Sequence, residues 1–223
     1  MTRSQHASSA RLDGDGGAVI VEFALVLPLL ALMFLGIVDF GNAYRYRNTL
    51  ESSLTTAART GSQLSRNRFA DYELLRSLSS GLDVVGSPKL AIVWKANSTN
   101  EVPPACLGIS AVGVGKKGIP GVCNVYSKEQ IETSNPVGFP AGASTNPLTP
   151  PQNQPPAATP PCPSASWDAN WCSWQRNNFI GSGDYLGLHV EMEYTPITGI
   201  TGSAVITMTE STIYRLEPPF VGG

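Results

Sequence analysis

Charge is scarce in this chain of 223 residues. Only 14 % of the side chains are Asp, Glu, Lys or Arg, where about 25 % is usual for a soluble protein, while 42 % of the residues are apolar. The 15 basic and 17 acidic residues nearly cancel, so the chain lacks the positive field that attracts nucleic acid, and we expect no nucleic-acid partner. Low charge with ordinary hydrophobicity also argues against a chain that is disordered throughout.

Residues that bind metals or catalyse reactions are equally scarce. Two His and four Cys, with no C-x-x-C pair, do not supply the ligand spacing of a structural zinc site, so we expect no metal. We expect His189 to be solvated on the polar face of a strand, and Glu191 and Glu193 on that face to be solubilising. The segment from Gly113 to Lys117 lacks the spacing of a phosphate-binding loop. We therefore expect no enzyme activity, no cofactor and no small-molecule substrate.

A long apolar run dominates the N-terminal part of the chain. From Ala18 to Val38 the sequence reads AVIVEFALVLPLLALMFLGIV, 21 residues whose only charge is Glu22. A helix of that length is about 30 Å long, the thickness of a bilayer's hydrocarbon core, which predicts a membrane span. A cleaved secretory signal, with Tyr44 as the new N-terminus, is the alternative. The uncharged stretch from Phe23 to Val38 is at or beyond the long end of such signals.

Beyond Asp39 the pattern becomes amphipathic. Apolar and small residues recur at steps of three and four, which predicts a helix with one narrow apolar face; they are Leu50, Leu54, Ala57, Gly61 and Leu64. We expect this helix to continue to about Leu78, with Asn67 as a possible earlier break. The small residues would allow another backbone to approach closely, and packing against the protein's own sheet is the simplest use of this face.

Glu22 is the residue of the span that needs a physical explanation. A carboxylate at the centre of a bilayer costs about 2.5–3.5 kcal/mol, and less near the interface. Either Glu22 lies at the headgroup level and reaches water, or it has a positively charged partner. Proteolysis after Gly17 would give Ala18 a charged amine. In helices stacked with an axial stagger, that amine would offset the Glu22 carboxylate of a neighbour.

The same residues carry a resemblance to a known family. Residues 17–23, GAVIVEF, match the G-x-x-x-x-E-[FY] processing motif of type IV prepilins. The run from Gly17 to Ser62 resembles the TadE-like family of tight-adherence pilus assembly proteins, also called minor pilins or pseudopilins, through VEFALVLPLLALMFLGIVDFG and the following AARTGS. The resemblance implies that Gly17 precedes a cleavage site, that Ala18 becomes the new N-terminus, and that Glu22 and Phe23 serve recognition and assembly.

The resemblance also implies location and partners. It implies a single-pass protein of the cell membrane whose C-terminal domain is extracytoplasmic, possibly incorporated in a pilus. The implied partners are the cytoplasmic membrane, a prepilin peptidase and other pilins or pilus assembly proteins.

The rest of the chain predicts a pilin-like α+β domain. Segments 89–96, 184–195 and 203–216 read as strands, which we expect to form an antiparallel sheet with one buried face resting on the helix. The predicted organisation is a leader (1–17), a transmembrane helix (18–39), an amphipathic helical extension (40–82) and an exported sheet domain (83–223). Residues 101–183 are expected to be an insertion in this domain, with a Pro-rich part at 136–163.

The insertion holds all four cysteines. Cys106 and Cys123 are 17 residues apart, and Cys162 and Cys172 are ten apart. We expect disulfides, worth about 2–4 kcal/mol each, which require an oxidising compartment. Sequence leaves three pairings open.

Three tryptophans lie around the last cysteine, at positions 167, 171 and 174. They form either a small core behind a disulfide or an exposed aromatic surface for a partner or a glycan. The second interpretation leads to the alternative function: a secreted or signal-anchored binding protein that uses its Trp- and Pro-rich insertion for recognition.

Limited proteolysis tests the predicted insertion. The segment from Pro136 to Pro163 contains ten Pro in 28 residues, a composition that cannot bury enough apolar surface to offset the entropy of ordering. Protease should therefore cut there first, as peptide masses would show. Cuts that fall instead between Asp184 and Leu216 would contradict the predicted domain organisation.

Overall fold

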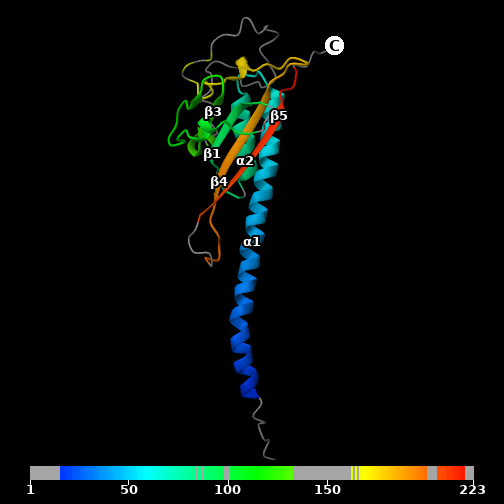
Figure 1. Cartoon of the computed structure of the whole chain (residues 1–223), viewed down its shortest axis with the longest axis vertical. Coiled ribbons are helices and arrows are strands. Elements are labelled where there is room, and N and C mark those ends of the chain that lie inside the picture. Colours follow the sequence, from blue (N-terminus) through cyan, green and yellow to red (C-terminus); the bar gives the residue numbers. More distant parts are fainter. Residues whose placement is uncertain are drawn as a thin grey trace, which may run out of the picture.

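The structure is a computed structural model that describes residues 16–83, 85–86, 88–97, 101–132, 162, 164, 166–199 and 205–218. It confirms the α+β class: a long N-terminal helix and a small antiparallel sheet. The sheet and a second helix pack against the C-terminal part of the long helix, whose N-terminal part projects away from them (Figure 1). Most of the predicted leader, and all but residue 162 of the Pro-rich segment 136–163, lie outside the described residues.

The long helix, α1, spans Gly16–Leu64 and is 49 residues, or about 73 Å, long. The prediction that it continues to Leu78 is wrong, because the chain turns at Ser65, whose φ of 45° no α-helix accommodates. Asn67 stabilises the turn, since its side-chain oxygen accepts the Phe69 N–H at 2.9 Å. A separate helix, α2, then spans Ala70–Leu82.

The helix α2 packs back along α1 as an antiparallel hairpin. Small residues allow this close approach: a Cβ atom added to Gly61 would overlap Leu74, and one added to Gly81 would overlap Ser53. Ala57 and Ala58 are completely buried in the same core. The small residues of the amphipathic segment therefore serve a contact within the chain.

The sheet has five antiparallel strands in the order β2-β3-β1-β4-β5. The three predicted strands are present as β1 (Pro88–Ala96), β4 (Tyr185–Tyr194) and β5 (Ile206–Arg215). Two more come from the region expected to be an insertion, β2 (Gly118–Ile119) and β3 (Cys123–Ser127). All five residues of β3 are buried, so the first part of this region belongs to the core. Short helices complete the fold: α3 (Pro104–Leu107), α4 (Lys128–Glu132) and the 3-10 helix η3 (Ser173–Gln175).

Apolar side chains cover both faces of the sheet at β1 and β3, where one buried face was expected. On one face Ala91 and Val93 meet the leucines of α1 and α2. On the other, Ile92 and Trp94 pack under residues 102–122, which the Cys106–Cys123 disulfide ties to β3. The reason is that successive side chains of β1 point to opposite faces of the sheet, and its central side chains are apolar on both faces.

Trp94 places a strict requirement on the neighbouring strand. It is completely buried and lies opposite Gly187 of β4 in the sheet register. A Cβ atom on Gly187 would overlap the indole ring. The ring therefore occupies space that only glycine leaves open.

Replacing Gly187 by Ala should lower the free energy of unfolding by about 1–3 kcal/mol, the usual cost of overpacking. Urea unfolding of the full chain in detergent micelles, followed by Trp fluorescence, measures it. Gly108→Ala is the matched control, because the nearest atom to its added Cβ would lie 3.9 Å away. Equal stability of the two variants would contradict the proposed role of Trp94.

Candidate functional site

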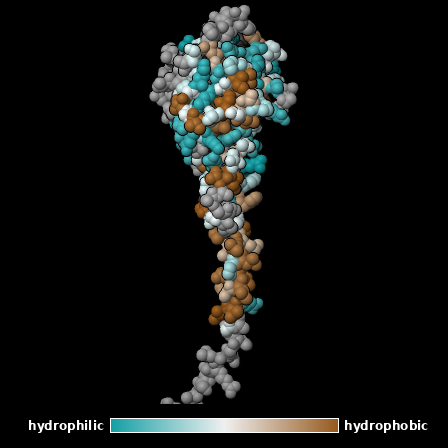
Figure 2. Space-filling view, turned by 60° about the vertical axis from the view of Figure 1, so that its left-hand side comes forward, coloured by the Kyte–Doolittle hydropathy of each residue, from teal (hydrophilic) through white to brown (hydrophobic). Residues whose placement is uncertain are grey.

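The N-terminal part of α1 exposes large apolar side chains around its whole circumference (Figure 2). From Val19 to Phe40 these side chains are 37 % to 75 % exposed. The segment reaches a mean hydropathy of 2.5 over 18 residues, none of them buried, and it is the one described helix long and apolar enough to cross a membrane. A helix that is apolar all round requires a protein core or a lipid environment. The described chain offers no such core, which supports single-pass membrane anchoring.

The processing motif lies at the start of this helix. Gly17 is the second residue of α1, and apart from its own stretch of helix no described atom lies within 4 Å of a Cβ built on it. The protein itself would therefore accept a larger side chain there. Glu22 is exposed on the next turn, and no described residue forms an ion pair or hydrogen bond with it. Phe23 beside it is 60 % exposed.

A site that sequence reasoning missed lies where the helix leaves its apolar part. The buried Asp39 carboxylate accepts the N–H groups of Ile197 and Thr198, both at 3.1 Å, and the hydroxyl of Thr198. The hydroxyl of Tyr194 donates to the Asp39 carbonyl at 3.3 Å. These bonds fix the segment after β4 to the end of the apolar run. The available signal was an acidic residue directly after 16 uncharged ones, since such a charge needs donors.

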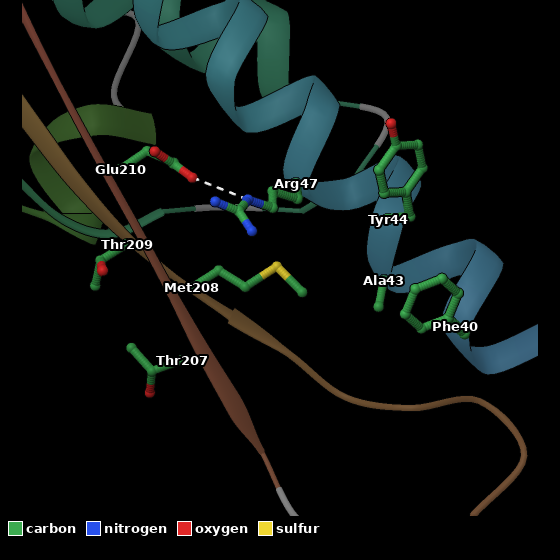
Figure 3. A pocket seen from close by; sticks show the side chains of 8 residues that line it. All are labelled: Phe40, Ala43, Tyr44, Arg47, Thr207, Met208, Thr209 and Glu210. Atoms are coloured by element: carbon green, nitrogen blue, oxygen red, sulfur yellow. Dashed lines mark hydrogen bonds and ion pairs between the residues drawn. The ribbon is translucent and has the colours of Figure 1, made fainter. Parts of the chain in front are cut away.

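A groove of about 430 Å³ lies just beyond Asp39, between α1 and β5 (Figure 3). Arg47 closes one end by donating to Glu210 at 3.1 Å. Met208 extends from the strand toward the helix, and Phe40 lies at the other end. The groove holds this one ion pair and no cluster of titratable groups. Its lining residues are Phe40, Ala43, Tyr44, Arg47, Thr207, Met208, Thr209 and Glu210.

The polar face of β4 differs from its prediction at one residue. His189 was expected to be solvated, yet it is only 7 % exposed, and its Nδ1 lies 2.7 Å from the Ser211 hydroxyl on β5. Burial lowers the pKa of His189 below its usual value. The Glu191 carboxylate is 3.8 Å from Nε2, too far for a hydrogen bond, so no aligned Ser-His-carboxylate chain forms. Glu193 makes a surface ion pair with Lys89 at 3.0 Å.

A buried polar cluster joins three parts of the fold. The Asp71 carboxylate of α2 accepts the Tyr126 hydroxyl at 2.5 Å, the Asn124 amide at 3.1 Å and the Arg176 guanidinium. The Asp71 and Arg176 side chains are fully buried, and the guanidinium stacks 4.5 Å from the Trp171 ring. The cluster therefore attaches residues 166–178 to β3 and α2.

The second disulfide and the tryptophans belong to the same region. Cys162 pairs with Cys172, so the four candidate cysteines form two disulfides, each between neighbours in sequence. Trp171 is 1 % exposed and Trp167 packs against the core. Trp174 lies under the Arg68 guanidinium at 5.0 Å. Trp171 therefore fits the core interpretation, whereas Trp167 and Trp174 are half-buried.

A second buried carboxylate, that of Asp168, lies near this cluster. Asp168 is 1 % exposed and accepts the Ser166 hydroxyl. Burial, and then the nearby Asp71 charge, raise the pKa of Asp168 to about 6 from a usual value of 3.8. Between these two pH values the folded state therefore keeps a proton on Asp168 that the unfolded state has lost. The contribution of this group to the free energy of unfolding is complete only below pH 4, and it is lost as the pH rises through 6.

Asp168→Asn should remove this pH dependence, because the amide keeps an acceptor for Ser166 and carries no charge. The parent should lose up to about 3 kcal/mol between pH 4 and pH 7 relative to the variant. Urea unfolding at several pH values measures the difference, with the exposed Asp83→Asn as control. Parallel pH profiles for the parent and the Asp168→Asn variant would refute the assignment.

Comparison with known proteins identifies a family match for the N-terminal segment. No curated protein and no solved structure matches the chain. One family model, described as TadE-like protein, matches residues 17–59. That range begins at Gly17 and includes the apolar run, Asp39 and the start of the amphipathic part. The resemblance to the TadE-like family is therefore confirmed, and it rests on the segment that carries the processing motif and the candidate membrane span.

Proposed function

We propose that this protein is a non-catalytic, membrane-anchored assembly component or minor pilin of a tight-adherence pilus. The match of residues 17–59 to the TadE-like family carries the proposal. The exposed apolar helix supports it, since it needs either lipid or other apolar helices around it. During pilus assembly the helix would lie first in lipid and then among the apolar helices of other subunits.

A prepilin peptidase is the proposed processing enzyme, and it cuts between Gly17 and Ala18. The motif around this bond supports the assignment, as does the open space around Gly17. A peptidase that excludes bulky side chains before the scissile bond would explain a glycine here, because the chain's own packing does not require one.

The proposed assembly contact is between Glu22 of one subunit and the Ala18 amine of another. Glu22 is the only charge between residues 18 and 38, and no described residue offsets it. In a stack of apolar helices it would be desolvated, and an amine of opposite charge would then stabilise it. An axial stagger of neighbouring helices brings the two groups together.

The C-terminal domain is proposed to be extracytoplasmic. Both pairs of cysteines are bridged, and such bridges persist in oxidising compartments. The burial of Trp171 speaks against the alternative, a secreted or signal-anchored binding protein that uses its Trp- and Pro-rich insertion for recognition.

Two substitutions separate processing from assembly. Gly17→Leu should abolish cleavage, whereas Gly36→Leu, a matched change at another open glycine of α1, should leave it intact. Glu22→Gln should be cleaved yet lower recovery in the pilus fraction, because an unpaired buried amine costs about 3–5 kcal/mol. The mass of each mature N-terminus and the amount recovered with pili are the measurements.

Glu51→Gln, at an exposed position on the same helix, is the control for assembly. A Glu22→Gln protein that is processed and assembles like the parent would eliminate the carboxylate–amine contact. Normal cleavage of Gly17→Leu would eliminate the assigned processing site.

A further inference from the structure

We propose that the domain rests on the membrane surface through a second, apolar contact, which we call the collar. It consists of Phe40 and Tyr44 on α1, Ile197 after β4, and Val205 and Ile206 at the start of β5. Its proposed occupant is the interfacial region of the same lipid bilayer that α1 spans. The inference rests on the proposed membrane anchoring and adds a contact outside the helix.

The position of the collar follows from the Asp39 hydrogen bonds. The apolar run from Val19 to Val38 is about 30 Å long as a helix, which matches the hydrocarbon thickness. Asp39 is the next residue, and its carboxylate holds the backbone N–H groups of Ile197 and Thr198 at 3.1 Å. The segment after β4 is thereby fixed at the end of the apolar run, where α1 would leave the hydrocarbon; Figure 1 shows this segment beside α1 at the lower end of the domain.

The chemistry of the collar suits that level. Its side chains are large, apolar and exposed: Phe40 75 %, Ile197 70 %, Tyr44 61 %, Val205 53 % and Ile206 41 %. They come from three separate segments of the chain, yet all lie near the end of the span. Aromatic and aliphatic side chains at a membrane interface are stabilised by partial burial among headgroups and upper acyl chains.

The polar groups around the collar are compatible with a lipid surface. The Asp39 carboxylate accepts hydrogen bonds from donors of the chain itself, so it needs no donor from the lipid. Arg45 is exposed one turn and a half beyond Asp39, within reach of headgroup phosphates. Farther along β5 the outward side chains become polar, beginning with Thr207 and Thr209. The apolar surface thus ends where water would begin.

Quenching by brominated lipids tests the collar in the full chain. The protein is reconstituted into phosphatidylcholine–phosphatidylglycerol vesicles with bromines high on the acyl chains, and Ile197→Trp is compared with Ile180→Trp. Ile180 is 84 % exposed and precedes the opposite end of β4. The tryptophan at 197 should emit at shorter wavelength and lose its added emission to the bromines. The tryptophan at 180 should do neither.

Flotation of the same vesicles keeps the two proposals distinguishable. Protein that floats with the vesicles while the 197 probe stays unquenched would overturn the collar and leave anchoring intact. Protein that does not float would overturn the anchoring itself, and the collar with it. A blue-shifted but unquenched probe would mean that a second copy covers the patch, which also overturns the proposal. Ile206→Trp repeats the measurement at the start of β5.

Discussion

The continuity of α1 through residue 39 is the constraint on which the rest of the structure depends. One uninterrupted helix of 49 residues has an apolar first part and a second part that supplies the core of a folded domain. The two parts need different surroundings, and the change occurs within about one turn. At that turn the chain places Asp39, buried and fully hydrogen-bonded by the segment after β4. The globular part therefore begins where the apolar run ends, with no linker between them.

Local patterns predicted much of this arrangement. The apolar run, the amphipathic continuation and the three longest strands depend on hydrophobic periodicity, which reports burial directly. The candidate processing residues Gly17 and Ala18, and the candidate recognition and assembly residues Glu22 and Phe23, could be proposed because motif and span coincide, and the family match confirms the resemblance over that segment. Whether those residues act as proposed is a matter for the variants described above.

The features that sequence did not predict depend on distant partners. β3 is only five residues long and carries Asn124 inside the sheet, which is stable because the Asn124 side chain bonds to Asp71 and to the Trp171 backbone. Asp71 and Arg176 are 105 residues apart, so no local pattern connects them. The burial of His189 likewise depends on Ser211 across the strand pair. The sequence marks the end of α1 after Leu64 only weakly, because Ser65 and Asn67 are also acceptable within a helix. They form a turn here because α2 packs back along α1.

The hydrogen bonds between Asp39 and the segment after β4 also have a mechanical consequence. A domain tethered by a flexible linker swivels freely, and a pull on it straightens the linker before any load reaches the membrane. Here the bonds from residues 194, 197 and 198 to residue 39 oppose rotation of the sheet about the helix axis. Torque or tension applied to the sheet would therefore pass directly into the apolar part of α1, without first straightening a linker.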